Sequence, residues 1–372
     1  MKKPKSKSPV NLAGYERLAQ RVLPKPIFDH AAGGAEDEIT LRDNTAAFER
    51  LRLVPHILRD VTARDHAVTI LGQRASFPVI LAPIACLRRF HRDGELAAAR
   101  AAGGAGIPCM LSTGSCLSLE EVAEASNASL FFQLYPYSDA EITRRLVERA
   151  ETAGYKAIAL TVDVPVGGRR ERDIINQYVY PPRLLRKSLT KVGFTDKHLN
   201  FDPTQLPAFA AEALTVAFTW ELVAWLRSLT RLPLLLKGVL AKSDALRAVD
   251  YGVDGVVVSN HGGRQLDGTP AAIEVLEEIA GAVHGRMEIL FDSGVRRGTD
   301  VLKALALGAK AVLLGRPYVW ALAAGGQAGV QNALRLLREE FDVAMALTGS
   351  ARVAEIDSSL IWRGAARQID RG

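Results

Sequence analysis

The sequence has little cysteine, few aromatic residues and no long apolar run, and each shortage excludes a class of protein. Three cysteines, Cys86, Cys109 and Cys116, occur in 372 residues, without a C-x-x-C pair or a histidine at metal-ligand spacing. This pattern predicts neither a disulfide framework nor a zinc site. Because reduced cysteines are typical of a reducing compartment, we expect a cytoplasmic location.

Charged residues interrupt every apolar stretch well before the roughly 18 residues that a membrane-spanning helix needs. The basic start, MKKPKSK, runs into Pro9 and Asn11 rather than into an apolar segment, so no signal peptide is expected. The net charge is +6, and acidic and basic residues are interleaved over the rest of the chain. We therefore expect no nucleic-acid partner, and the basic run is typical of a solvated tail.

Short apolar runs separated by helical segments are what the sequence does contain. Eight such runs span residues 78–83, 108–112, 130–135, 157–163, 233–238, 255–260, 288–293 and 311–315. The segments between them, such as DAEITRRLVERAETAG and RGTDVLKALALG, are rich in helix formers and often end in glycine. Strand and helix alternating eight times predict an α/β fold of the (β/α)8 TIM-barrel type.

Two segments do not fit the repeat. Residues 1–75 contain YERLAQRVL and DEITLRDNTAAFERLRL and are predicted to form an N-terminal helical extension on the bottom or side of the barrel, which would occupy residues 76–372. The connection after the fourth strand, about 164–232, is twice as long as the others and includes PPRLLRKSLTKVGFTDKHLNFDPTQLPAF, which has no clear periodicity. Long loops of this kind are often active-site lids, so we predict a lid over about residues 176–216.

Polar residues follow almost every predicted strand. Because the carboxyl ends of the strands of such a barrel meet at one mouth, these residues become neighbours. In chain order they are Pro83, Ile84 and Ala85; Ser112, Thr113 and Gly114; Gln133 and Tyr135; Thr161 and Asp163; Lys237; Ser259, His261 and Arg264; Asp292, Gly294 and Arg296; and Gly315 and Arg316. Any one of them alone is adequately explained as a structural residue, but their convergence favours a functional site, since burying unpaired polar groups costs about 1–3 kcal/mol each.

Glycine and arginine follow the last two predicted strands, in DSGVRRG and GRP. This pattern predicts a phosphate site, in which backbone amides and guanidinium groups hold the anion. The hydroxyl, amide and backbone groups after strands one to four can hydrogen-bond a flat heterocycle across the mouth. Flavin mononucleotide (FMN) fits both halves of this pattern.

The sequence resembles the FMN-dependent L-2-hydroxy acid oxidases and dehydrogenases, a family that includes glycolate oxidase, lactate oxidase, L-lactate dehydrogenase and mandelate dehydrogenase. SNHGGRQLDG, beginning at Ser259, is similar to the family's active-site signature. LAPIA, FFQLY, ALTVDVPVGGRRERD, LLKGV, DSGVRRGTDVLKALALGA and LGRP match in the same order around it. The similarity runs from about residue 15 to about 357.

The resemblance implies oxidation of an L-2-hydroxy acid to the 2-keto acid, with a role for each matched residue. His261 is the expected base, Asp163 its orienting partner, and Tyr135 a hydrogen-bond donor to the substrate oxygen. Arg264 and Arg170 are expected to hold the substrate carboxylate. Whether the proton leaves the α-carbon or the hydroxyl is left open by the sequence.

The resemblance also implies a set of cofactor contacts. Lys237 is expected near the part of the flavin where negative charge develops on reduction. The ring is expected to contact Ala85, Ser112, Gln133 and Thr161, and the ribityl chain and phosphate to contact Asp292, Gly294, Arg296, Gly315 and Arg316; Pro83, Ile84, Ser259 and Ser293 complete the predicted site.

Two positions depart from the family pattern. His30, in FDHAAGGAEDE, stands where the family usually has a tyrosine that binds the substrate carboxylate. It is either a replacement that still donates a hydrogen bond or a sign that the carboxylate is held differently, esterified or amidated. Gly114 stands where glycolate-type enzymes have tryptophan, which predicts room for a branched or aromatic substrate.

Alternative functions remain at this point. One is FMN-dependent oxidation of a modified or peptide-derived substrate, motivated by His30; another is a non-catalytic flavin binder, which the set of His261, Asp163 and Arg264 argues against. The electron acceptor is expected to be oxygen or a quinone-type carrier, and the resemblance implies a homotetramer. A solvated lid is favoured over peripheral membrane contact through RLLRKSLTK.

Overall fold

Eight parallel strands close into a barrel in this computed structural model, which describes residues 9–195, 212 and 217–364. The strands, in their order around the barrel, are β10 (Ala311–Leu314), β3 (Val79–Leu81), β4 (Cys109–Ser112), β5 (Leu130–Leu134), β6 (Ile158–Thr161), β7 (Leu234–Val239), β8 (Gly255–Val258) and β9 (Glu288–Phe291). Each pairs in parallel with its neighbours, and β10 pairs with β3 to complete the ring. The predicted (β/α)8 fold is confirmed.

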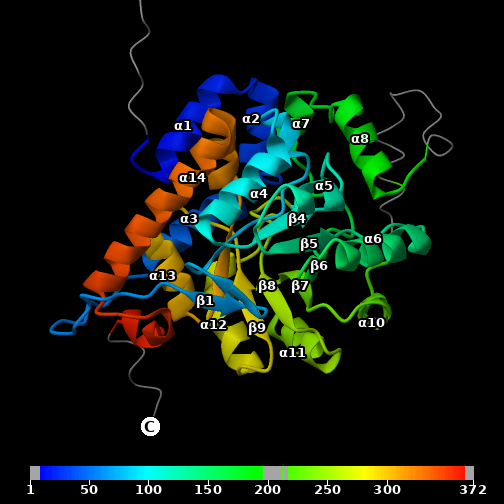
Figure 1. Cartoon of the computed structure of the whole chain (residues 1–372). Helices are drawn as coiled ribbons and strands as arrows, with labels where there is room; N and C mark the ends of the chain where they lie inside the picture. The colour runs from blue at the N-terminus through cyan, green and yellow to red at the C-terminus, as the bar shows by residue number, and fades with distance from the viewer. Residues whose placement is uncertain (1–8, 196–211, 213–216, 365–372) are drawn as a thin grey trace, which may run out of the picture.

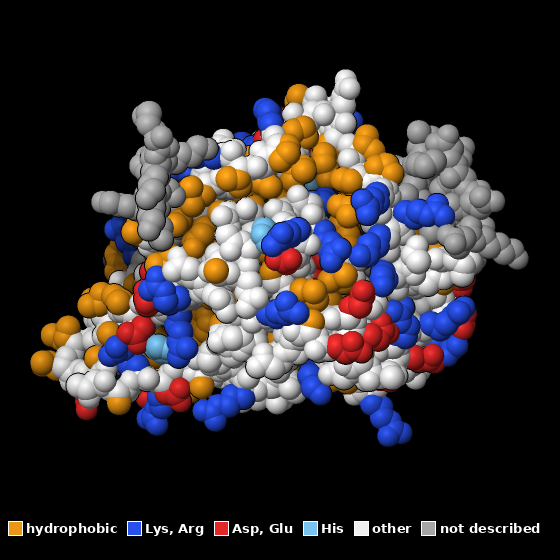
Figure 2. All heavy atoms as spheres, turned by 45° about the horizontal axis from the view of Figure 1, so that its top comes forward, with side chains coloured by type: hydrophobic (Ala, Val, Ile, Leu, Met, Phe, Trp, Pro, Cys, Tyr) orange, Lys and Arg blue, Asp and Glu red, His pale blue; other side chains and the backbone are white. Residues whose placement is uncertain are grey.

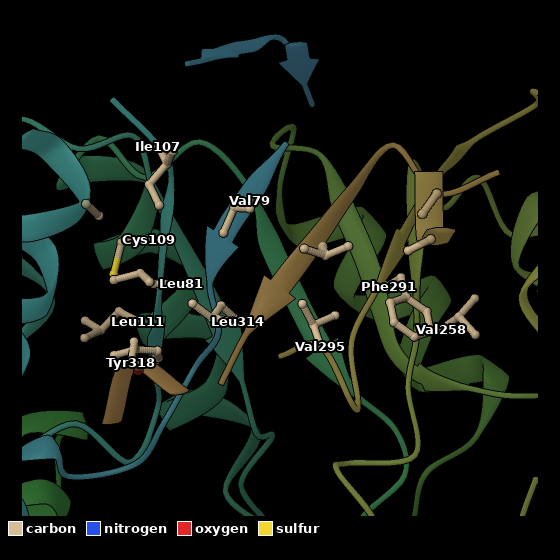
Figure 3. Packing of buried hydrophobic residues seen from close by; sticks show 14 of the residues in the cluster. Val79, Leu81, Ile107, Cys109, Leu111, Val258, Phe291, Val295, Leu314 and Tyr318 are labelled. Carbon is tan, nitrogen blue, oxygen red and sulfur yellow. The ribbon is translucent and has the colours of Figure 1, made fainter. Parts of the chain in front are cut away.

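Both faces of each strand are buried, which explains why the runs are continuously apolar. Ile80, Phe131 and Leu290 belong to the cluster that fills the interior, whereas Val79, Leu81 and neighbouring outward residues pack against the helices. Figure 3 shows part of this outer cluster, with side chains from β3, β4, β9 and β10 meeting residues of the surrounding segments. The apolar core therefore fixes the eight strand ends at one mouth.

Helices follow the strands and form the outer layer (Figure 1). They are α4 (Gly94–Ala105), α5 (Leu119–Glu124), α6 (Ala140–Thr152), α10 (Trp220–Leu229), α11 (Lys242–Asp250), α12 (Ala272–Val283), α13 (Gly298–Ala306) and α14 (Arg316–Leu347). Local sequence sets their ends: Ser118 and Glu121 form a reciprocal capping box at the start of α5. The long α14 is kinked at Gly326, whose φ of 56° lies in the left-handed region.

The N-terminal segment forms α1 (Leu12–Val22), α2 (Lys25–Ala32), α3 (Ile39–Arg50) and a hairpin of β1 (Val68–Ile70) and β2 (Gln73–Ala75) that the sequence did not predict. Helix α1 lies along α14, and α2 contacts α7 (Glu171–Ile175) (Figure 1). His30 and Ala31 of α2 line a cavity at the mouth, so the expected position on the bottom or side of the barrel is wrong for this helix. The hairpin side chains join the interior cluster of the barrel, and the Leu71 amide donates to the carboxylate of Glu288, the first residue of β9. The hairpin therefore covers the end of the barrel opposite the mouth.

The connection after β6 contains α7 (Glu171–Ile175) and α8 (Pro182–Val192), before α10. The expectation that PPRLLRKSLTKV has no helical order is wrong, because α8 buries Ser188, Leu189 and Val192 on one side. Its first turn contains proline, and Gly193 ends it in the left-handed conformation. The remaining part of the predicted lid, residues 196–211 and 213–216, lies outside the described residues.

A disulfide joins Cys86 to Cys116, with a Cα–Cα distance of 5.1 Å, so the expectation of unpaired cysteines is wrong for these two. The bridge was missed because the cysteines are 30 residues apart in sequence and become neighbours only when β3 and β4 pair. Cys109 is buried and free, and burial raises the pKa of its thiol to about 12. The cysteine content therefore no longer supports a reducing compartment. Among the described residues, no helix has the length and apolar character to cross a membrane.

Candidate active site

A cavity of about 310 Å³ opens at the carboxyl ends of the strands. It is lined by every predicted site residue except Asp163, Gly114 and Ser259. Asp163 and Ser259 instead hydrogen-bond residues that do line it. The sequence prediction that these residues meet at one mouth therefore agrees with the geometry.

His261 and Asp163 form a dyad at the strand ends. Nδ1 of His261 lies 3.0 Å from Oδ1 of Asp163, and no hydrogen bond to Nε2 is found among the described residues. His261 adopts a left-handed backbone conformation (φ 57°), and its amide donates to Oγ of Ser259. Asp163 is accommodated by Gly238, where a Cβ atom would approach its carboxylate to 2.7 Å or less. The dyad thus leaves one imidazole nitrogen available to a substrate.

Electrostatics keep the His261 imidazole neutral. Burial opposes the positive charge and outweighs the attraction of Asp163, so the pKa of His261 is lowered below its usual 6.5. The pKa of Asp163 is also lowered, because His261 and Lys237 outweigh the effect of its burial. A neutral imidazole beside a charged carboxylate is the form that a general base requires.

Lys237 supplies a buried positive charge at the end of β7. Its Nζ lies 3.0 Å from Oδ2 of Asp292 and 3.0 Å from Oγ of Ser259. Burial opposes the ammonium, but Asp292 and Asp163 outweigh it and raise the pKa of Lys237. Lys237 therefore stays charged inside the cavity.

Three strand-end side chains form a continuous hydrogen-bonded row. Oγ of Ser112 donates to Oε1 of Gln133 at 3.0 Å, and Nε2 of Gln133 donates to Oγ1 of Thr161 at 3.0 Å. All three are buried and line the cavity. The row fixes donors and acceptors on one wall, as a polar heterocycle requires.

Arg170 and Arg264 bring guanidinium groups to the cavity, close enough to Tyr135 for their charges to act on the pKa of its hydroxyl. Nη1 of Arg264 donates to the carbonyl oxygens of His30 (2.7 Å) and Gly33 (2.9 Å). Burial, followed by repulsion from Arg170 and Arg316, lowers the pKa of Arg264 well below its usual value. Nε of Arg170 is buried without a hydrogen-bond partner. This concentration of positive charge suits an anionic ligand.

Arg296 and Arg316 also line the cavity, and Arg316 is the first residue of α14. Nη2 and Nη1 of Arg316 donate to the carbonyl oxygens of Gly33 and Gly262. Gly294 has a φ of 104° and faces the Asn44 carbonyl so closely that a Cβ atom would lie 2.0 Å from it. Two guanidinium groups, a helix N-terminus and a close backbone turn fit a phosphate, and with the hydrogen-bonded row they fit FMN as a whole.

His30 reaches the cavity from α2 and is held by two neighbours. Its Nδ1 lies 2.9 Å from Oδ2 of Asp173, and its ring stacks on Tyr178 with centroids 4.4 Å apart. Burial, with repulsion from Arg89 and Arg264, lowers the pKa of His30 to about 4. The pKa of Asp173 is lowered too, where the hydrogen bond to His30 and nearby positive charges outweigh burial. Nδ1–H therefore donates to Asp173, which leaves Nε2 as an acceptor.

Gly114 does not line the cavity. A Cβ atom there would lie 2.8 Å from the Cβ of Ala85, which does line it, so a side chain at position 114 would be directed toward the cavity wall at Ala85. That Gly114 leaves room for a larger substrate stays a prediction.

The sequence missed Arg89, Phe90 and Tyr180, which also line the cavity, and Asp173, the partner of His30. The only signal for Arg89 was its place in CLRRF, directly after the first strand. Two adjacent arginines on a loop do not reveal which of them turns inward. Tyr180 lies between α7 and α8, in a segment that the strand pattern did not place.

Comparison with known proteins gives one matching family model, similar sequences and similar solved structures. Residues 19–363 match the family model described as FMN-dependent dehydrogenase. L-lactate oxidase from Nostoc sp. is 50% identical over 95% of this chain and 98% of that protein, and human 2-hydroxyacid oxidase 1 is 49% identical over 93% and 95%. A crystal structure of mandelate oxidase with (S)-4-hydroxymandelic acid superposes with a TM-score of 0.86 at 48% identity, covering 93% of this chain and 97% of that one.

Proposed function

The chain belongs to the FMN-dependent dehydrogenase family, and from this premise we propose how its own residues act. It is an oxidoreductase that uses FMN to oxidise a 2-hydroxy acid to the 2-keto acid. FMN, when held in the cavity, would supply the two-electron acceptor that this oxidation requires. The cavity at the strand ends supplies the remaining groups.

We propose that Arg170 and Arg264 hold the substrate carboxylate. The observation in support is that both guanidinium groups line the same part of the cavity and that Nε of Arg170 is buried without a partner. Tyr135 lies beside them, and burial raises the pKa of its hydroxyl to about 12, so it remains a hydrogen-bond donor. Together these groups orient the α-carbon and its hydroxyl.

His261 is the proposed base, and the dyad with Asp163 is the single observation that carries the proposal. Nε2 of the neutral imidazole takes the substrate proton, and Asp163 stabilises the imidazolium that results through its contact with Nδ1. The buried ammonium of Lys237 favours the negative charge that the cofactor gains on reduction. Arg296 and Arg316 hold the phosphate.

His30 does not repeat the role of the tyrosine usual in the family. With Nδ1–H donating to Asp173, its Nε2 can accept a hydrogen bond but cannot donate one to a carboxylate. The carboxylate therefore depends on Arg170, Arg264 and Tyr135. This geometry also keeps open the second candidate, a substrate whose acid group is modified or peptide-derived.

For the acceptor we propose oxygen, since the curated relatives carry the names L-lactate oxidase and 2-hydroxyacid oxidase. A quinone-type acceptor is the alternative. The homotetramer, the cytoplasmic location and the division at residue 75 remain predictions.

The test is anaerobic reduction of the FMN in the purified protein by a panel of L-2-hydroxy acids, followed by reoxidation with air and with quinone analogues. We expect loss of the oxidised-flavin absorbance with at least one acid and its return in air. If no free acid reduces the flavin, the modified or peptide-derived substrate is favoured. A protein that takes up no FMN would contradict the proposal as a whole.

A further inference from the structure

We propose that Arg89 binds a second anionic group on the substrate, so that the preferred substrates are 2-hydroxy acids with an additional carboxylate at the far end of the side chain. The proposal rests on the proposed function, because it concerns the same cavity. It names a specificity residue that takes no part in the proton transfer.

Arg89 reaches the cavity from the short helix η1 (Leu87–Arg89), in the loop after β3. It lines the same space as His30, Arg170 and Arg264, the groups at the substrate end. Arg89 is close enough to His30 for its positive charge to add to the effect of burial in lowering the pKa of His30. Lys and Arg side chains gather near the middle of the face that Figure 2 turns forward.

Arg89 is held in place by neutral groups. Nη2 donates to the Ala85 carbonyl oxygen at 2.9 Å, Nε to that of Cys86 at 3.3 Å, and Nη1 to the hydroxyl of Tyr178 at 3.0 Å. The guanidinium also stacks over the ring of Tyr180, 4.6 Å from its centroid. These contacts fix its plane, and each of the two Nη atoms keeps a second hydrogen to donate.

None of these contacts neutralises its charge. Within the described part of the chain, no carboxylate lies within ion-pair distance of Arg89. The nearby carboxylates bond other groups: Asp173 bonds His30, and Oε1 of Glu95 accepts from the amides of Leu87 and Cys116. A half-buried guanidinium without a counter-charge is costly unless a ligand supplies one.

A single carboxylate cannot serve all three arginines. In the proposed function the reacting carboxylate is held by Arg170 and Arg264, which leaves the charge of Arg89 unmatched. A second carboxylate on the same molecule would meet the free Nη hydrogens of Arg89. Because its hydrogen bonds fix the plane of the Arg89 guanidinium, the group favours bidentate binding of a carboxylate.

Phe90 and Tyr180 line the cavity near Arg89, and they define the competing class of substrate. An aromatic 2-hydroxy acid could pack its ring on these side chains and on the guanidinium face. The charge of Arg89 would then matter little. The experiment has to separate a carboxylate from an aromatic ring of the substrate.

The experiment measures kcat/KM for L-2-hydroxyglutarate, for the equally long L-2-hydroxypentanoate and for L-mandelate, with the FMN-loaded enzyme and the variants Arg89→Met and Arg92→Gln. Arg92 belongs to the same loop but is 90% exposed and does not line the cavity, so it is the matched control. We expect the enzyme and Arg92→Gln to favour the dicarboxylate by roughly tenfold to a hundredfold. Arg89→Met should lose that preference, mainly through a higher KM for the dicarboxylate.

Equal use of the two aliphatic acids by the unaltered enzyme would overturn the inference, as would a preference for mandelate or an equal loss on both acids in Arg89→Met. Should Arg89→Met not fold, inhibition of the unaltered enzyme decides: glutarate must compete at least tenfold more strongly than the equally long pentanoate. Failure of the proposed function looks different, because no acid would then reduce the flavin.

Discussion

The two ends of the cavity are built in different ways. At the phosphate end, Gly294, Arg296, Gly315 and Arg316 all follow β9 or β10 directly. At the substrate end, Tyr135 and Arg264 also follow strands, β5 and β8, but His30 comes from α2, Arg89 from the loop after β3, and Arg170 and Tyr180 from the long connection after β6. The phosphate end follows from two consecutive barrel loops, whereas the substrate end also draws on three segments that are far apart in the sequence.

This difference indicates which end of the cavity can change in sequence without loss of the cofactor. In the proposed function the phosphate end binds the same cofactor whatever the substrate, and its groups are set by the turns after two adjacent strands. The substrate end depends on docking, and the carbonyl oxygen of Gly33 shows how: it accepts hydrogen bonds from both Arg264 and Arg316, which hold the segment after α2 over the mouth. Changes at the substrate end can therefore alter specificity without loss of the cofactor.

Substitution of the base should give the largest effect and should leave the phosphate end intact. We expect His261→Asn to lower kcat by about 10²- to 10⁴-fold with normal FMN content, because asparagine tolerates the left-handed backbone but cannot take the proton. Stopped-flow flavin reduction measures it. His284→Asn is the control, since His284 is exposed and has a similar φ of 50°. A small loss at position 261 would refute the assignment of the base.

Removal of the disulfide should loosen the substrate end more than the phosphate end. The bridge closes a loop of 30 residues, so Cys86→Ser with Cys116→Ser should destabilise the fold by about 3–4 kcal/mol in the chain-entropy account. Thermal unfolding of the double variant measures this loss. Cys109→Ala is the control because Cys109 is unpaired. An unchanged melting temperature would mean that the bridge does not form in the folded protein.

Substitution at the phosphate end should reverse the pattern, with loss of cofactor and not of specificity. Arg296→Met should weaken FMN binding by about tenfold to a hundredfold, as expected for a hydrogen bond to a charged group. Ultrafiltration followed by flavin fluorescence measures retention. Arg297→Met, next to it but outside the cavity, should retain FMN. Normal FMN retention in both variants would contradict the phosphate assignment.

The pH dependence of kcat/KM tests His261 as the base, independently of the arginines proposed to hold the substrate carboxylate. Burial lowers the pKa of His261 below 6.5, so its neutral, active form persists at pH 6.5 and is lost as the pH falls through that lower pKa. We expect kcat/KM to be level near pH 6.5 and to fall about tenfold per unit on the acid side of the pKa. An acid limb centred above 6.5 in the pH profile of kcat/KM would be inconsistent with a desolvated base.

Restoring the usual tyrosine should have the smallest effect. His30→Tyr adds a donor for the substrate carboxylate, worth about 0.5–1.5 kcal/mol, and should lower KM by about two- to tenfold with kcat nearly unchanged. Steady-state kinetics with the best substrate measure both values. A large fall in kcat instead would mean that His30 takes part in proton transfer.

The barrel could be predicted because its signal is local and repeated. Runs such as GVVV became β8, and parallel pairing then brought the polar residues after each run to one mouth. Two elements escaped: α8, whose pattern was read as irregular, and the hairpin of Val68–Ala75, whose short strands gave no clear alternation. Within the site, Asp173 and Tyr180 were not predicted, because they belong to segments whose position depends on tertiary packing.

The sequence by itself determined the fold class, the His261 and Arg264 pair on one loop and the glycine- and arginine-containing turns after β9 and β10, because each depends on residues within a strand and the loop that follows it. The tertiary structure alone decided that Cys86 meets Cys116, that Nδ1 of His30 hydrogen-bonds Asp173, and that Arg89 rather than Arg88 enters the cavity. These contacts join residues that no local pattern relates, and they form only when the barrel closes and the outer segments dock on its mouth.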